Sequence, residues 1–205
     1  LLGGMMPEGV ELVQKRHQVY TARRIGKGTN RLKDEFRQLG MLRTGVAKRI
    51  PERYLRASIA DRVQLLHGLM DTDGTCQGKP DRPSSFCTFT TISEGLASDV
   101  VDLVCGLGGH AKVSQQQPWC VGEQGKVAGK PCYRINVALP AGILPFSLPR
   151  KLERYQPRSK YPVLRTIVDI AQDGQEECRC ITVDAPDHLY LTDACIVTSN
   201  CDELA

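Results

Sequence analysis

The segment between residues 61 and 74 constrains the fold of this chain more than any other. Five of the eight residues 63–70 are large apolar residues, and the run lies between Asp61 and the polar run Asp71-Thr72-Asp73-Gly74. This pattern predicts a buried helix that Asp61 leads and that stops at Asp73-Gly74. Gly68 has no side chain, so a second helix can approach the backbone closely there. Asp71 and Asp73 add carboxylates at the helix end, and a hard cation prefers such ligands.

An ordinary amphipathic helix followed by an Asp-Gly turn would give the same short pattern, so the flanking residues decide between the two interpretations. Residues 66–74 resemble the LAGLIDADG motif of homing endonucleases, which are also called DOD-type. The runs at 48–51 and 54–58 look like the region before the second such motif in intein endonucleases. The resemblance implies Mg²⁺-dependent cleavage of double-stranded DNA. It assigns catalysis and metal binding to Asp73, makes Asp71 a weaker candidate ligand, and places Gly68 where two motif helices meet.

The order of expected elements agrees with that resemblance. Residues 61–155 are predicted to form a helix, two strands, a helix, two strands and a helix, with strands over 75–77, 86–92, 111–115 and 132–139. We expect an α+β fold in which a saddle-shaped sheet has helices on one face and an open face that fits a duplex groove. Before it, the pattern predicts a hairpin over 10–25, a helix that Thr29 or Asn30 caps, and a short helix after Pro51.

Charge is divided unevenly along the chain. Residues 1–160 hold 25 Lys and Arg against 14 Asp and Glu, whereas residues 161–205 hold 2 against 9. Spaced cations release the counterions of phosphates, so the first region is expected to bind a polyanion, although a solvated basic surface would look the same. The residues expected to contact DNA are Arg16, Arg23, Arg24, Lys27, Lys48, Arg49 and Arg134.

The acidic tail carries a second chemical pattern, an Asn followed by a nucleophile at Asn200-Cys201. The amide nitrogen of Asn200 can attack its own carbonyl carbon and break the chain before Cys201 as a succinimide forms. Residues 178–201 resemble the C-terminal splicing blocks of inteins, and the resemblance makes His188 the general acid or base.

Two residues of the tail indicate the class 3 type of intein. Cys180 stands where many inteins have Asp, and Thr198 lies two residues before Asn200. In class 3 inteins the block Cys is a nucleophile and is paired with that Thr and with a Trp in the N-terminal half. Trp119, the only Trp of the chain, lies in the endonuclease region. We therefore expect a C-terminal fragment that lacks the N-terminal splicing half.

The resemblance also sets the expected domains. Residues 1–60 are the remainder of a first endonuclease half, 61–158 the second half, and 159–200 an all-β part of the splicing (Hint) domain, with strands over 163–170, 178–183 and 188–197. Residues 201–205 begin the host protein, or extein, and Cys-Asp-Glu-Leu is compatible with an ATPase such as a helicase or phage terminase. Since residues 1–9 are a poor first motif, with Pro7 in the last turn, we expect no cutting by this chain alone. The alternative is a non-catalytic DNA-binding module or a decayed homing endonuclease.

The spacing of the nine cysteines argues against a metal-binding structural protein. They contain no C-x-x-C pair, and the Cys178-Arg179-Cys180 spacing suits zinc poorly, so a metal-binding structural protein is not favoured. We expect a reducing cytoplasm, in which most of the five scattered cysteines are small core thiols: Cys76, Cys87, Cys105, Cys120 and Cys132. We also expect no disulfide partner, no membrane segment, and no cofactor for splicing.

Overall fold

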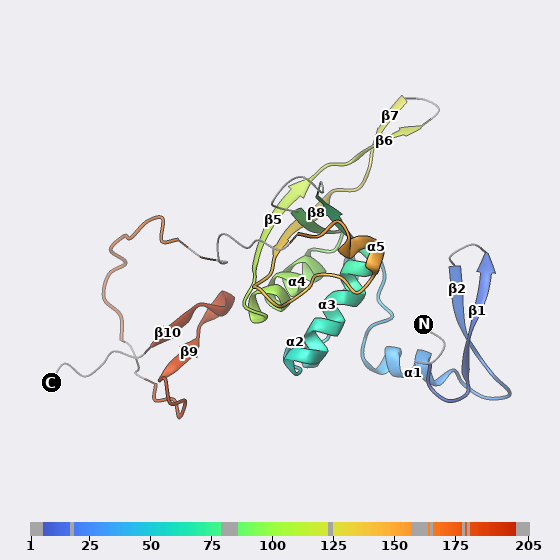
Figure 1. The fold of residues 1–205 in the computed structure, drawn as a ribbon, viewed down its shortest axis with the longest axis horizontal. Helices are drawn as coiled ribbons and strands as arrows, with labels where there is room; N and C mark the ends of the chain where they lie inside the picture. Colours follow the sequence, from blue (N-terminus) through green and yellow to red (C-terminus); the bar gives the residue numbers. More distant parts are fainter. Residues whose placement is uncertain are drawn as a thin grey trace.

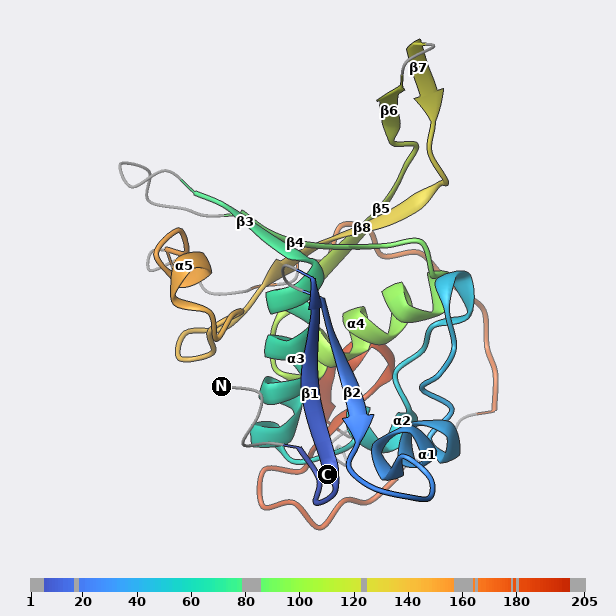
Figure 2. The ribbon, with the colours of Figure 1, turned by 90° about the vertical axis from the view of Figure 1, so that its right-hand side faces the viewer.

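The computed structural model of the chain describes residues 6–16, 19–78, 86–122, 125–156, 164, 166–177, 179 and 181–199. Its centre is an antiparallel sheet of four strands in the order β3-β4-β8-β5. Helices α3 (Ile59–Asp73) and α4 (Glu94–Gly106) lie under one face of this sheet, and the other face is open (Figure 2). The strands are β3 (Gly74–Gln77), β4 (Phe86–Thr91), β5 (His110–Gln116) and β8 (Cys132–Ala138). The expected order of helices and strands is thus confirmed, whereas the saddle curvature stays a prediction.

Helix α3 begins one turn earlier than the sequence predicted. Ser58, not Asp61, is its N-cap: the Ser58 hydroxyl accepts a hydrogen bond from the Asp61 backbone N–H at 3.2 Å and donates one to the Asp61 carboxylate at 2.7 Å. The first of these bonds satisfies one of the backbone N–H donors that a helix start leaves unpaired, and the second orients the Ser58 hydroxyl. The helix ends at Gly74 as expected, and a side chain there would collide with the Met70 carbonyl.

The core lies between the helices and the sheet. Leu66 and Met70 of α3 are fully buried, together with Phe89 of β4 and Ile135 of β8. Helix α4 is capped by Ser93 and buries its stripe of Leu96, Val100, Leu103 and Val104. These residues belong to one contiguous cluster, which orients α3 and its terminal acids against the sheet.

Two hairpins extend away from this core (Figure 1). The first joins β1 (Val10–Arg16) to β2 (Val19–Arg24) where a hairpin was predicted, and α1 (Arg31–Gln38) follows it with Asn30 as N-cap. The second joins β6 (Trp119–Gly122) to β7 (Gly125–Ala128), between β5 and β8, and was not predicted. Shorter elements are a 3-10 turn η2 (Gly45–Ala47), α2 (Glu52–Leu55) after Pro51, and α5 (Pro149–Leu152).

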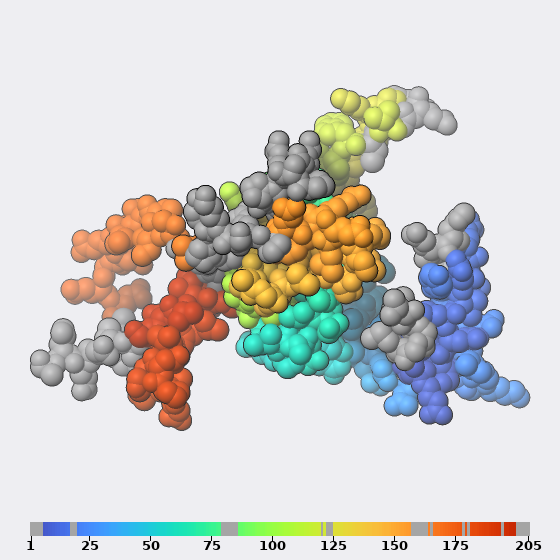
Figure 3. Space-filling view, in the orientation of Figure 1, coloured from blue at the N-terminus to red at the C-terminus, as the bar shows by residue number. Residues whose placement is uncertain are grey.

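The tail differs from its prediction. Among its described residues, strands occur only as the hairpin of β9 (Leu189–Leu191) and β10 (Val197–Ser199), with a 3-10 turn η3 (Asp193–Cys195) between them. The strands expected over 163–170 and 178–183 are absent from the described parts of those ranges, where Ile167, Val168 and Ile170 are exposed. The tail lies at the opposite side of the core from the β1–β2 hairpin (Figure 3). Within the described chain, no helix has the length and apolar character needed to cross a bilayer.

Candidate nucleic-acid interface and metal site

The open face of the sheet carries polar side chains in register. Successive side chains of a strand point to opposite faces of the sheet, so residues that point to the core alternate with residues that point outward. Thr75, Thr88, Asn136 and Lys112 are paired across the four strands and form one row, and Thr90, Arg134 and Ser114 form the next. Thr88 is itself 3% exposed and its hydroxyl is hydrogen-bonded to that of Thr75. The other members of the two rows offer hydrogen-bond donors, acceptors and two cations to a ligand above the sheet.

Only Arg134 of this face was predicted to bind DNA, and Lys112 and Asn136 were missed. The signal was present in β8, where core-facing Ile135 and Val137 alternate with Arg134 and Asn136. On β5 the alternation is weaker because Val113, on the core-facing parity, is exposed. Pairing with β8 therefore identifies Lys112, and the sequence alone does not.

The other basic residues expected to contact DNA are not gathered on this face. Arg16 and Lys27 are exposed on or beside the β1–β2 hairpin, which stands apart from the sheet (Figures 1 and 2). Arg23 is committed to an ion pair with Glu11 at 2.8 Å across that hairpin. Arg24 is half-buried, with its guanidinium beside Gly28.

Arg49 has a structural partner. Its guanidinium donates to the Asp99 carboxylate of α4 at 2.7 and 2.9 Å, and this hydrogen-bonded anion raises the pKa of Arg49 further above its usual value. The pair ties the basic segment at 48–50 to the core, and its neighbour Lys48 remains exposed. DNA contact by these residues stays a prediction.

The two acids at the end of α3 differ in their contacts. Asp71 accepts hydrogen bonds from the backbone N–H groups of Ser147 and Leu148 and from the Ser147 hydroxyl, so it holds the loop that enters α5. Asp73 is exposed, and its carboxylate makes no hydrogen bond or ion pair with any residue that the structure describes. Asp73 is therefore the acid whose oxygens can turn to an external group.

A metal ion needs more ligands than Asp73 supplies. In the described part of the chain, no group of three or more His, Cys, Asp or Glu side chains is placed to hold one. Mg²⁺ is held by carboxylates together with water and phosphate oxygens, so one exposed carboxylate can be part of a site but does not complete it. The metal roles of Asp73 and Asp71 remain predictions.

Lys151 of α5 is a neighbour of these acids that the sequence did not reveal. Its ammonium donates to the carbonyls of Met70 and Gly74 at 2.7 and 2.6 Å and so caps the end of α3. Burial lowers the pKa of Lys151, and the nearby Arg150 cation lowers it too, while Asp71 and Asp73 oppose both. The sequence showed only a short basic helix, because the contact spans 77 residues or more.

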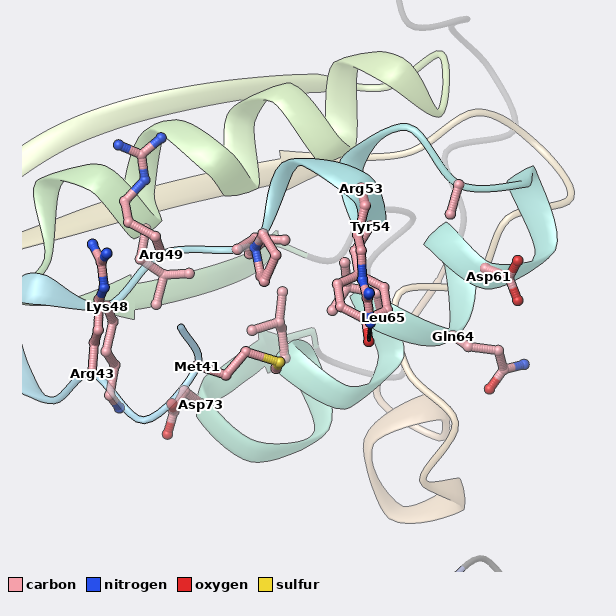
Figure 4. A pocket seen from close by; sticks show the side chains of 15 residues that line it. Met41, Arg43, Lys48, Arg49, Arg53, Tyr54, Asp61, Gln64, Leu65 and Asp73 are labelled. Atoms are coloured by element: carbon pink, nitrogen blue, oxygen red, sulfur yellow. Dashed lines mark hydrogen bonds between the residues drawn. The ribbon is translucent and has the colours of Figure 1, made fainter. Parts of the chain in front are cut away.

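A groove of about 840 Å³ runs along α3 (Figure 4). Arg43, Lys48 and Asp73 lie toward one end, and Asp61 and Gln64 lie toward the other. Gly68 is exposed on α3, and nothing lies within 4 Å of the place where its side chain would begin. Among the described elements none covers Gly68, and its expected role at a helix interface stays a prediction.

The expected splicing residues are only partly within the described structure, since Cys180, Asn200 and Cys201 lie outside it. Thr198 is on β10 opposite Tyr190, and Ser199 is opposite Leu189. His188 immediately precedes β9 and has a φ of 54°, an uncommon conformation for a residue with a side chain. The register therefore puts His188 at the end of the hairpin from which the chain continues to Asn200.

Comparison with known proteins gives two matches. Residues 61–128 match the family model described as a LAGLIDADG-like domain. Over 173 residues, the chain is 30% identical to the replicative DNA helicase DnaB of Mycobacterium intracellulare, a match that covers 82% of this chain and 28% of the helicase. The chain thus spans little more than a quarter of the length of that curated relative. The family match takes in α3 from Asp61 to Asp73 and strands β3, β4 and β5, whereas β8 of the same sheet lies beyond it. Residues 61–128 form a LAGLIDADG-like domain.

Proposed function

We propose that residues 61–156 bind double-stranded DNA on the open face of the four-stranded sheet, as part of a homing endonuclease. The observation that carries the proposal is the register of that face, which sets Lys112 and Arg134 beside Asn136, Thr90 and Ser114. Amide and guanidinium groups form paired hydrogen bonds with base edges in the major groove, and both cations can neutralise phosphates. LAGLIDADG-like domains are associated with homing endonucleases, which supports duplex DNA as the ligand.

Cleavage is proposed for an assembly in which a second acid-bearing helix packs on α3 along the face of Gly68. Asp73 would then share Mg²⁺ with the second carboxylate, and the metal would polarise the scissile phosphate. The described residues bring only Asp73 to this position, and no cleavage step is derived for them. The chain by itself is therefore proposed to bind DNA without cutting it.

The test is duplex binding measured by fluorescence anisotropy at several salt concentrations, with a random-sequence duplex because the target is undefined. Each phosphate contact contributes about 0.9 to the slope of log K against log salt, so Lys112→Ala with Arg134→Ala is expected to reduce the slope by about 2. Arg56→Ala is the matched control, because Arg56 is an exposed cation paired with Glu52 on α2, away from the sheet. Equal slopes for the double variant and the control would refute the sheet as the DNA-binding face.

A second activity is supported by a separate observation, the placement of His188 at the end of the β9–β10 hairpin that leads to Asn200. We infer that this tail is the C-terminal part of an intein of the class 3 type, inserted in a helicase of the DnaB type. Asn200 would close on its own carbonyl carbon, the peptide bond to Cys201 would break, and His188 would donate a proton to the departing nitrogen. Cys180, Thr198 and Cys201 would serve the earlier acyl transfers, without a cofactor.

Intact-mass spectrometry tests the tail, since cleavage removes residues 201–205 and leaves a succinimide at Asn200. We expect slow loss of these five residues, abolished by Asn200→Ala and reduced by about 10²-fold or more in His188→Ala. His110→Ala is the control, because His110 lies on β5 of the distant sheet. Loss that continues in Asn200→Ala would show ordinary proteolysis and would contradict the intein assignment.

A further inference from the structure

Cys76 and Cys87 face each other inside the four-stranded sheet. They are direct partners in the antiparallel pairing of β3 with β4, and both side chains point to the core, with 9% and 3% of their surface exposed. Their Sγ atoms are 3.6 Å apart, and the Cys87 thiol donates toward the sulfur of Cys76. The Cys76 thiol in turn donates to the carbonyl of Arg154, at 3.3 Å. Two thiols at this distance can react with each other, which separate core thiols cannot do.

We propose that Cys76 and Cys87 form an oxidation-sensitive dithiol site, reduced at rest and closed to a disulfide by peroxide. Directly opposite residues of an antiparallel pair have Cα atoms roughly 4.5–5.5 Å apart, which is within the range of about 4.4–6.8 Å that disulfides require. The strands already hold the correct register, so closure needs rotation of the side chains and a small approach of β3 to β4. Cys76 lies on β3, one of the two edge strands of the sheet, which is paired on one side alone and can move toward β4 more easily than a central strand.

The chemistry balances with hydrogen peroxide as the oxidant. One thiol attacks the peroxide, its sulfur becomes a sulfenic acid, and one water leaves. The second thiol then attacks that sulfur, the disulfide bond forms, and the hydroxyl departs with the remaining thiol proton as a second water. The two sulfurs lose two electrons in total, and the peroxide accepts them.

Closure would change the end of α3. Cys76 lies three residues after Asp73, and its thiol proton, lost on oxidation, is the one that hydrogen-bonds to Arg154 just after α5. Helix α5 carries Lys151, which caps α3 on the carbonyls of Met70 and Gly74. Oxidation would thus fix β3 to β4 and release one contact of the segment that caps the motif helix. The dithiol site stands independently of the proposed DNA binding, and only an effect on the DNA-facing rows of β3 and β4 would rest on it.

Peptide mapping of the folded chain tests the site directly. The chain is treated with hydrogen peroxide under native conditions, its remaining thiols are alkylated, and it is then digested with a protease that cuts before Asp. Cuts before Asp73, Asp81 and Asp99 release Cys76 and Cys87 in two different peptides, 73–80 and 81–98. We expect the two peptides to be joined, about 2 Da lighter than their sum, and to separate on reduction.

The control variants replace cysteines of the same four-stranded sheet. Cys132→Ser removes another buried thiol, on β8, and is expected to leave the 73–80 to 81–98 linkage unchanged. Cys87→Ser is expected to abolish it, and the wild-type map decides the question by itself should that variant fail to fold. Recovery of the two peptides unlinked after oxidation, or of Cys76 joined to a different cysteine, would overturn the proposal.

Discussion

Asp99 is the charged side chain on which the position of the basic segment before α3 depends. It is 1% exposed on α4, and its carboxylate accepts hydrogen bonds from the Arg49 guanidinium and from the backbone N–H of Ile50 at 2.7 Å. A buried carboxylate is stable only when such donors surround it. Arg49 is itself 56% exposed, so water can replace Asp99 as its partner, whereas the buried Asp99 has no such replacement for Arg49.

That inequality predicts which variant is more harmful. Asp99→Asn keeps an acceptor for Ile50 and leaves a hydrated Arg49, and it should lower the free energy of unfolding by about 1–3 kcal/mol. Arg49→Met leaves a buried charge without its cation, which is expected to cost more than the loss in Asp99→Asn. Urea unfolding of both variants measures the order. If Arg49→Met proved the milder change, the contact would be an exposed pair of little energetic weight.

Helices α3 and α4 both begin with a serine N-cap, but the two serines contribute differently to stability. Ser58 caps α3 in an exposed turn, whereas Ser93 caps α4 while completely buried, and its hydroxyl also lies 2.9 Å and 2.7 Å from the carbonyls of Val46 and Lys48. Ser93 thereby joins the start of α4 to the segment that carries Lys48. A buried hydroxyl with several partners leaves those partners unpaired when it is removed.

We therefore expect Ser58→Ala to lower the free energy of unfolding by about 1 kcal/mol, the usual value of an N-cap, and Ser93→Ala to lower it by about 2–3 kcal/mol. Thermal and urea unfolding of the two variants provide the comparison, and Ser114→Ala on the open sheet face is a control with little expected effect. Similar losses for Ser58→Ala and Ser93→Ala would mean that the carbonyl contacts of Ser93 add nothing.

Around the core, the elements that the sequence predicted are those with one buried face, whereas the β1–β2 hairpin and α1 were predicted although they bury almost nothing. Helices α3 and α4 and strand β8 repeat apolar residues at their own period, because each packs against the same core. Strand β4 also places Cys87 and Phe89 in that core, although Thr88 between them is buried as well. The β6–β7 hairpin escaped prediction since Trp119, Val121 and Val127 are exposed and leave no such period. In the tail, Ile167, Val168 and Ile170 have strand propensity, but propensity forms no strand without a partner. Lys112 and Lys151 were missed for a similar reason, because pairing and packing over long separations define their positions.

At the scale of the whole molecule, stability is concentrated in the middle of the chain. The buried cluster draws its members from residues 50–146, and the partly buried residues packed on it extend to Tyr155. The β1–β2 hairpin contributes only Val10 to the buried apolar residues, and residues 166–177 of the tail are exposed throughout. The N-terminal part of the basic region and the acidic tail thus both pack less closely than the middle of the chain. Segments with little buried apolar surface open at low free energy, and the core opens only with global unfolding.

Brief digestion with trypsin should therefore separate these parts. Arg16, Arg23 and Lys27 lie on or beside the exposed hairpin, and Arg179 lies in the exposed tail, so early cuts are expected there. Arg62 donates to the Gly106 carbonyl from within α3 and should resist until the core unfolds. The protected fragment should begin between Gly28 and Thr44 and end at Arg154 or Arg158, with one further early cut after Lys126 of the exposed β6–β7 hairpin. Mass spectrometry of the time course identifies the cuts, and Asp99→Asn provides a destabilised comparison in which the fragment should decay faster. Early cleavage at Arg62 in the wild-type chain would show that α3 is not held by the core, and the orientation of Asp73 against the sheet would then have no basis.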